Sequence, residues 1–351
     1  MNKLSTQLAV VGTATAMALV FAGAPTGVRA APATNVFCGQ DLTQDTKLDG
    51  DLTCPGLVPF AALVMNTDDV TLDLGGFTIA GSGADFGVFV TDEREGVTIK
   101  NGTIQGFGVG VWAQGHRNLE LSKLIFKNYG FFGTAITNGQ DIVIRNSSFL
   151  SPPASSCGGH RAIQFRGVAN VAVNNVDVHG GFGAVEISCN LCDGSEAPTN
   201  GKITNSTFTA TNLAVVIVNT SDLIISSNHF SNNVATAACD AGAAILSPQQ
   251  AGLQPRTGMV IKDNFIHDNT SGITLFAVVA GAEIKGNQVR DNTITGINLV
   301  QRDGVPSTGN LIKDNLTSGN GLDLFHGGFS TSNTWKNNSC ETKDGADIPD
   351  C

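Results

Sequence analysis

A short pattern recurs eleven times along the chain and constrains its fold more than any other feature. An apolar anchor and a variable residue precede two turn-forming residues, and another variable residue and a second anchor follow. Residues 98–104, Thr-Ile-Lys-Asn-Gly-Thr-Ile, contain it in full. The first anchors are Leu74, Ile99, Leu121, Ile144, Val173, Ile203, Ile225, Ile261, Ile284, Ile312 and Trp335, spaced 22 to 36 residues apart. Such a period, with strand-like alternation and no helical pattern, predicts a solenoid of stacked β coils.

The remaining positions of the repeat agree with that prediction. Most turn pairs carry Asn, Gly, Asp or Ser, which tolerate a left-handed backbone or close a turn on themselves. The second anchors, five residues after the first, are Ile79, Ile104, Phe126, Phe149, Val178, Phe208, Phe230, Ile266, Val289, Thr317 and Cys340. We therefore expect an all-β parallel β-helix of about eleven coils, with the four phenylalanines in its core.

Residues 1–30 have the features of a secretory signal peptide. Lys3 precedes an apolar run over residues 8–23, which is short for a membrane span, and Val28-Arg29-Ala30 approximates a small-x-small cleavage site. A retained membrane anchor is the alternative. We expect cleavage near Ala30 and a secreted or periplasmic mature protein without a membrane partner.

The net charge of −10 argues against nucleic acid as a partner. An anionic polysaccharide would need a local basic patch on such a chain. Four lysines follow the first anchors of four successive coils, namely Lys262, Lys285, Lys313 and Lys336. They predict a lysine column that either meets a polyanion or, beside Asp263 and Asp314, is a solvated face. No cofactor or metal is expected, and the oligomeric state stays open.

Eight cysteines, an even number, suit an oxidising compartment. Cys38 and Cys54 precede the repeats, and Cys340 and Cys351 follow them. We expect disulfides Cys38–Cys54 and Cys340–Cys351, which would staple terminal coils that otherwise expose their core. The chain then comprises a signal peptide (1–30), an N-terminal capping segment (31–56), a parallel β-helix (57–340) and a C-terminal disulfide cap (341–351).

The pairing of the inner cysteines Cys157, Cys189, Cys192 and Cys239 stays open. We favour 157–239, because both lie six residues before an apolar strand position, together with 189–192. The Cys-x-x-Cys spacing of the latter two leaves zinc binding as an alternative.

Residues from about 57 to 340 resemble the right-handed parallel β-helix repeat proteins of the pectin-lyase-like fold. Residues 70–79 and 97–104 look like the first coils of that family, and residues 333–340 are similar to the closing coil of many exported bacterial members. The resemblance implies a right-handed helix. It does not choose a function, because the family includes polysaccharide lyases, hydrolases, epimerases and non-catalytic binders.

The resemblance also implies that a substrate cleft runs over the outward residues of one parallel sheet. Most of these are small or apolar, but Gln164, Arg166, Glu186 and Ser188 form a polar patch that His160 and Arg161 precede. We predict His160, Arg166 and Glu186 as catalytic residues, and Arg161, Gln164, Ser188 and Trp112 as substrate-binding residues. Exposed aromatic side chains that could stack on sugars are Trp112, Phe89, Phe276 and Phe325.

The patch fits a uronate lyase or epimerase, which needs a cation against the carboxylate and a base for the C5 proton. Arg166 or Arg161 could supply the charge, and His160 or Glu186 could take the proton. A glycosidase needs two carboxylates, and only Glu186 is well placed. The alternative is a structural Arg166–Glu186 salt bridge on a non-catalytic carbohydrate-binding or cell-surface protein. The motif Tyr129-Gly130-Phe131-Phe132 begins like that of alginate epimerases but lacks their Asp-Pro-His.

Overall fold

The computed structural model describes residues 35–56, 60–83, 85–153, 159–188, 199–218, 220–236, 242–248, 257–276, 279–300, 307–327 and 332–351. Regular structure in these residues is β-strand, and successive coils pair in parallel. None of the described segments forms a helix that is both long and apolar enough for a bilayer. The expected signal peptide and the four inner cysteines lie outside the described residues.

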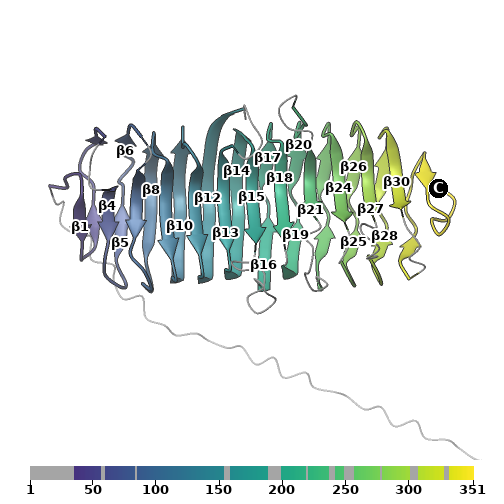
Figure 1. Cartoon of the computed structure of the whole chain (residues 1–351), viewed down its shortest axis with the longest axis horizontal. Helices are drawn as coiled ribbons and strands as arrows, with labels where there is room; N and C mark the ends of the chain where they lie inside the picture. Colours follow the sequence, from purple (N-terminus) through teal and green to yellow (C-terminus); the bar gives the residue numbers. More distant parts are fainter. Residues whose placement is uncertain are drawn as a thin grey trace, which may run out of the picture. The chain divides into compact units, whose positions relative to one another are not determined.

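One sheet, here sheet A, receives one strand from each coil in chain order (Figure 1). Its 13 described strands are β1 (Gln40–Leu42), β4 (Ala61–Met65), β7 (Phe86–Val90), β9 (Val109–Gln114), β11 (Phe132–Thr137), β13 (Arg161–Arg166), β15 (Gly183–Ser188), β18 (Leu213–Val218), β21 (Ala243–Ser247), β24 (Ser271–Phe276), β27 (Thr295–Val300), β30 (Leu322–Gly327) and β32 (Lys343–Asp344).

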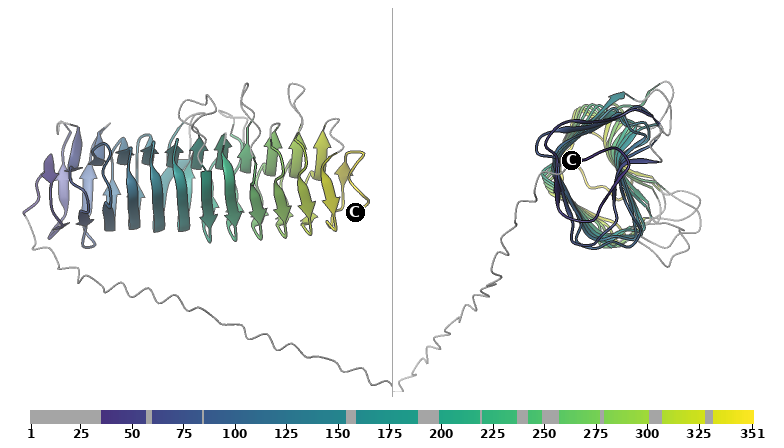
Figure 2. Two further views of the ribbon diagram at one scale, coloured as in Figure 1. Left: turned by 90° about the horizontal axis from the view of Figure 1, so that it is seen from below. Right: turned by 90° about the vertical axis from the view of Figure 1, so that its left-hand side faces the viewer.

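The remaining strands of each coil form sheet B. They are β2 (Thr46–Lys47), β3 (Leu52–Cys54), β5 (Thr71–Asp73), β6 (Thr78–Gly81), β8 (Thr98–Gln105), β10 (Arg117–Lys127), β12 (Gln140–Pro153), β14 (Ala169–Gly181), β16 (Thr199–Thr204), β17 (Thr207–Thr209), β19 (Ser221–Ser226), β20 (His229–Ser231), β22 (Val260–Lys262), β23 (Phe265–His267), β25 (Glu283–Lys285), β26 (Gln288–Arg290), β28 (Leu311–Lys313), β29 (Leu316–Ser318) and β31 (Thr334–Lys336). Seen end-on, the coils superimpose on one outline (Figure 2). The expected parallel β-helix is confirmed.

The first anchors stack in register inside the helix. Ile203 pairs with Val173 on one side and Ile225 on the other, and Ile261 pairs with Ile284. One anchor was misplaced: Leu72, not Leu74, is the register partner of Ile99. The two glycines after Leu74 lengthen that first turn, so the spacing of five residues fails there, although both leucines are buried.

The second anchors form another buried column, and its phenylalanines pack ring against ring as expected. The ring centroids of Phe126 and Phe149 lie 4.6 Å apart, and those of Phe208 and Phe230 lie 5.1 Å apart. All four side chains are fully buried. Burial of such large apolar surfaces is the main favourable contribution to the stability of the coil stack.

The turn pairs have the backbone that their composition predicted. From Asn101 to Asn337, the first member of every pair has a φ of 52–62°, in the left-handed region. In the C-terminal half the second member is an inward asparagine, and each Nδ2 donates to Oδ1 of the next coil. This ladder runs Asn228, Asn264, Asn287, Asn315 and Asn338, with donor–acceptor distances of 2.9–3.1 Å.

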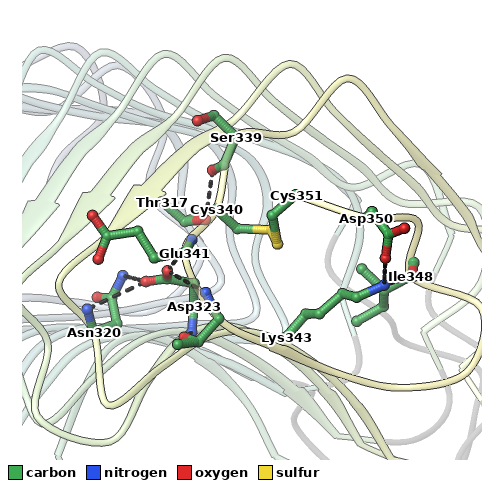
Figure 3. The surroundings of a disulfide bond; sticks show 11 residues. Thr317, Asn320, Asp323, Ser339, Cys340, Glu341, Lys343, Ile348, Asp350 and Cys351 are labelled. Carbon is green, nitrogen blue, oxygen red and sulfur yellow. Dashed lines mark hydrogen bonds and ion pairs between the residues drawn. A yellow bond between two sulfur atoms is a disulfide. The ribbon is translucent and has the colours of Figure 1, made fainter.

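A second asparagine ladder ends on a carboxylate at the last coils. It runs Asn233, Asn269, Asn292 and Asn320, and Asn320 Nδ2 donates to Asp323 Oδ1 at 2.7 Å. The other carboxylate oxygen of Asp323 accepts from the backbone N–H groups of Glu341 and Thr342 (Figure 3). The buried Asp323 carboxylate therefore provides acceptors for the last donors of this ladder and for two backbone N–H groups.

Both expected terminal disulfides, Cys38–Cys54 and Cys340–Cys351, are present. Figure 3 shows the second. The described part of the N-terminal segment contributes strands to both sheets: β1 pairs with β4, β2 with β5 and β3 with β6. At the other end β32 extends sheet A beyond β30.

Candidate functional site

The outward face of sheet A carries the residues singled out by the sequence. Strand alternation sends Val88 and Val90 into the core and Phe89 outward. Register pairing then aligns Phe89, Trp112, Ala135, Gln164 and Glu186 in one outward row across five strands. The row begins with the aromatic residues Phe89 and Trp112 and ends with the polar residues Gln164 and Glu186, so it has two distinct parts.

Four aromatic side chains make up the first part, here the aromatic platform: Phe60, Phe86, Phe89 and Trp112. The Phe60 ring lies edge-on to Phe89 with centroids 5.0 Å apart, and Phe86 lies 5.5 Å from Trp112 and 5.6 Å from Phe89. Phe60 is 44% exposed, and the other three are half-buried. The rings therefore support one another while part of their apolar surface faces solvent.

The second part is the charged patch around Arg161 and Glu186. Arg161 Nε lies 2.6 Å from Glu186 Oε2, and Gln164 Nε2 donates to Glu186 Oε1 at 3.3 Å. The Arg161 guanidinium also lies 5.1 Å from the ring centroid of Phe182. The charged side chains are 23% and 17% exposed, so solvent screens their attraction only in part.

The prediction that Arg166 contacts Glu186 is wrong, because the ion-pair partner of Glu186 is Arg161. Arg166 is paired in register with Ser188, and no ion pair links it to another described residue. Arg161 takes its place because its register partner is Gly183, which has no side chain. A Cβ built on Gly183 would lie 3.4 Å from Arg161 Cγ, so the arginine lies across that glycine and reaches Glu186.

Arg166, predicted as catalytic, and the other predicted substrate-binding side chains differ in accessibility. Arg166 is exposed and Trp112 is half-buried, whereas Gln164 and Ser188 are buried. Ser188 Oγ donates to the carbonyl of Phe165 at 3.4 Å, so its hydroxyl serves the backbone of the preceding coil. The platform and Arg166 are thus the more accessible parts of this face.

His160 immediately precedes β13 and lies beside Tyr129, with ring centroids 6.4 Å apart. Within the described part of the chain, the buried His160 Nδ1 has no hydrogen-bond partner. Burial raises the pKa of the Tyr129 phenol above its ordinary value, and the Ser151 hydroxyl opposes this shift. Sequence reasoning noted Tyr129 only as part of an incomplete motif and missed Ser151, which no local pattern connects to them.

A groove that the sequence did not reveal lies along the turns that follow β7, β9 and β11. Its volume is about 820 Å³. We call it the turn groove; its lining includes Asp92, Glu93, Glu95, Gln114, Arg117, Asn138 and Gln140. The buried His116 also lines it, with its ring nitrogens 3.1 Å from the Arg94 carbonyl and 3.3 Å from the Val90 carbonyl. Burial lowers the pKa of His116, and these two carbonyls oppose that shift.

Sheet B presents two further charged groups. The lysine column is in register as expected, but Lys285 and Lys313 each lie 3.0 Å from Glu283. Hydrogen bonds from these two lysines lower the pKa of Glu283. The column is therefore partly neutralised. Within the described ranges no group of three or more His, Cys, Asp and Glu side chains has the arrangement of a metal site.

The other group is a histidine pair. His229 Nε2 lies 2.7 Å from His267 Nε2, and His267 Nδ1 lies 2.6 Å from Asp268 Oδ2. The Phe265 ring stacks near His229, and the Arg290 guanidinium lies 4.9 Å from the Phe265 centroid. His229, His267 and Asp268 therefore form one hydrogen-bonded chain.

Fold and site together define a parallel β-helix protein with aromatic and charged residues on the outward face of one sheet. Residues 86–250 and 240–347 match the family described as the right handed beta helix region, and the chain belongs to that family. No curated protein matches the chain by sequence.

Several solved structures share this fold. The surface adhesin PfbA of Streptococcus pneumoniae is 13% identical with a TM-score of 0.58, over 85% of this chain and 82% of that one. The A-module of the Azotobacter vinelandii mannuronan C-5 epimerase AlgE6 is 12% identical with a TM-score of 0.53, over 86% and 90%. The tailspike of E. coli bacteriophage HK620, solved with a pentasaccharide, is 13% identical with a TM-score of 0.51, over 82% and 60%. At these identities the likeness shows the fold alone.

Proposed function

We propose that this protein binds an extracellular polysaccharide along the outward face of sheet A. The aromatic platform carries the proposal. Large exposed apolar patches on a soluble protein mark interaction sites, and aromatic rings bury much area with little loss of side-chain freedom. The apolar C–H face of a sugar ring is a natural partner for such rings, while its hydroxyl groups need polar neighbours. Arg161, Arg166 and Glu186 supply these further along the same face.

The geometry of the coil stack supports an extended ligand. Neighbouring strands lie about 4.8 Å apart, so a linear polymer running across the strands meets a new outward side chain at each coil. The row from Phe89 through Trp112 to Glu186 presents such a sequence of contacts. The similar folds of a mannuronan C-5 epimerase module and of a tailspike solved with a pentasaccharide are in keeping with a glycan partner.

The test is binding to a panel of polysaccharides, with calorimetry on those that bind. We expect Trp112→Ala to weaken binding about tenfold or more, which corresponds to about 1.4 kcal/mol. Phe265→Ala is the matched control, because Phe265 is a half-buried aromatic on β23 of sheet B and is not part of the outward face of sheet A. Equal effects of both variants, or no bound polysaccharide, would refute the proposal.

Polysaccharide modification of the lyase or epimerase type is the second candidate. The observation that favours it is the buried Nδ1 of His160, which has no hydrogen-bond partner among the described residues and lies beside Tyr129, since a purely structural histidine normally has its nitrogens satisfied. In this hypothesis His160 or Glu186 takes a proton, and Arg161 or Arg166 neutralises a substrate carboxylate. The carboxylate of Glu186 is already engaged by Arg161 and Gln164 and is not free to meet a substrate proton, so we rank binding first.

Modification is tested on the same panel by assaying new unsaturated ends, new reducing ends and C5 inversion. If the protein is an enzyme, His160→Ala should lower turnover at least about a hundredfold, the usual scale for a general base. If the parent protein turns over a polysaccharide and both His160→Ala and Glu186→Gln keep that turnover, the catalytic site does not lie in this patch.

We also propose that the protein is exported, with residues 1–30 as the signal peptide. The two terminal disulfides are the support, because such bonds persist in oxidising compartments. Amino-terminal sequencing of the mature protein should begin near residue 31. If the protein isolated from the producing cells still carries residues 1–30, the proposal is contradicted.

A further inference from the structure

The turn groove lies at the edge of the proposed glycan face and continues it. Gln114, which lines the groove, and Trp112 of the platform are two residues apart on β9 and point to the same side of the strand. Two residues of β-strand span about 7 Å. A glycan that stacks on Trp112 therefore reaches the groove within its next units.

Polar groups of the groove are available to a ligand. The side chains of Asp92, Glu93 and Gln114 are exposed, and none of them has a hydrogen-bond partner in the described part of the chain. Two other lining groups are engaged: Glu95 accepts from Asn118, and the Gln140 amide donates to Asp141. Carboxylates and amides accept and donate hydrogen bonds in the forked geometry that adjacent sugar hydroxyls require. The volume of the turn groove lies within the range of ordinary ligand sites.

The charge of the groove selects among glycans. Three carboxylates, those of Asp92, Glu93 and Glu95, face one guanidinium, that of Arg117. The exposed Arg166 at the end of β13 directly precedes Gly167 of the lining, and Arg94 lies 3.9 Å from Asp68, with which it forms an ion pair. A sugar carboxylate entering the groove would meet an excess of negative charge, whereas hydroxyl or amino groups would meet acceptors.

Building on the proposed function, we infer that the turn groove is a subsite for a sugar unit without a carboxylate, and that it disfavours uronates. The preferred glycan is thus uncharged or amine-bearing at this unit. The aromatic platform supplies stacking that is indifferent to charge, and the groove supplies the selection.

The experiment measures affinities for length-matched oligosaccharides of three kinds: a neutral glucan, a chitosan and a polygalacturonate. The neutral and amino oligosaccharides should bind at least about tenfold more tightly than the uronate at low salt. Salt should strengthen uronate binding, because it screens repulsion over about 10 Å at 0.1 M. Asp92→Asn/Glu93→Gln should bring the affinities to within about threefold of one another.

Asp49→Asn/Asp263→Asn is the control, since it changes the net charge equally at two exposed carboxylates that do not line the groove. The inference would be overturned if the parent protein bound the uronate as tightly as the other oligosaccharides or more tightly, or if the control variant narrowed the affinity differences as much as the groove variant. The proposed function would still stand if Trp112→Ala weakened the binding of every glycan. Absence of binding to all glycans would overturn both.

Discussion

Arg161 and Glu186 form an ion pair 2.6 Å long across two neighbouring strands, and the guanidinium also faces the Phe182 ring. The pair sits between solvent and core, with each side chain less than a quarter exposed. Its position at the centre of the outward row of sheet A makes it a structural element of the candidate site, whether or not it contacts a glycan.

We predict that Arg161→Ala lowers the free energy of unfolding by about 1–3 kcal/mol, because it leaves a largely buried carboxylate without its cation. Arg145→Ala is the control. Its partner Glu120 lies 2.8 Å away, but that pair is 45% and 34% exposed and should contribute only about 0–1 kcal/mol. Urea denaturation compares the two. A loss no larger for Arg161 than for Arg145 would mean that the site pair is screened like any surface pair.

The sequence predicted the coil register well, and the reason is physical. Each buried anchor must stack on its neighbour, so errors in register would turn a whole strand inside out. Ile203 and Ile261 were placed correctly for this reason, and Leu74 was misplaced only where two glycines lengthen a turn. The left-handed turn positions could be predicted equally well, because few residues tolerate that backbone conformation.

The site was less predictable because its contacts depend on side-chain reach. Alternation placed Gln164 and Glu186 outward, but it could not show that Gly183 leaves room for Arg161 to displace Arg166 as the partner. The turn groove could not be predicted from the sequence for a related reason. Its lining comes from turns of successive coils, and a hollow between turns has no signature in either turn alone.

Ile203→Asp should unfold or strongly destabilise the helix. Ile203 is fully buried between Val173 and Ile225, and an unpaired charge there costs several kcal/mol, on the order of the whole stability of many domains. Lys202→Asp is the control, because Lys202 is the exposed neighbour on the same strand. Circular dichroism during heating measures both. Unchanged melting of the Ile203 variant would contradict the coil register.

The asparagine ladder should be cooperative, and Asn287 tests it. This buried side chain donates to Asn315 and to the Ile261 carbonyl and accepts from Asn264. Asn287→Ala leaves several of these groups unsatisfied, and we expect a loss of about 1–3 kcal/mol. Gln288→Ala changes the next residue, which is exposed, and should be nearly neutral. If the two variants unfold at the same urea concentration, the ladder contributes little.

Acid should weaken the C-terminal half of the helix through the His229–His267 pair. Asp268 accepts from His267 Nδ1, so His267 Nε2 is left to accept from His229 Nε2–H. A proton on either ring sets two N–H groups against each other, and the Arg290 guanidinium nearby adds no acceptor. Burial first, and His267 second, lower the pKa of His229 below its ordinary value of 6.5.

A lowered pKa in the folded state means that the unfolded chain binds the proton more tightly. Stability is therefore complete above about pH 6.5 and falls as the pH drops toward the lowered pKa of His229. His229→Gln should reduce this loss between about pH 7.5 and pH 5, measured as the change in urea midpoint. His116 has its pKa lowered in the same direction by burial, so part of the pH dependence should remain. His179→Gln, a histidine of sheet B outside the pair, is the control. A pH dependence unchanged in His229→Gln, or reduced equally in the control, would show that the pair does not carry the effect.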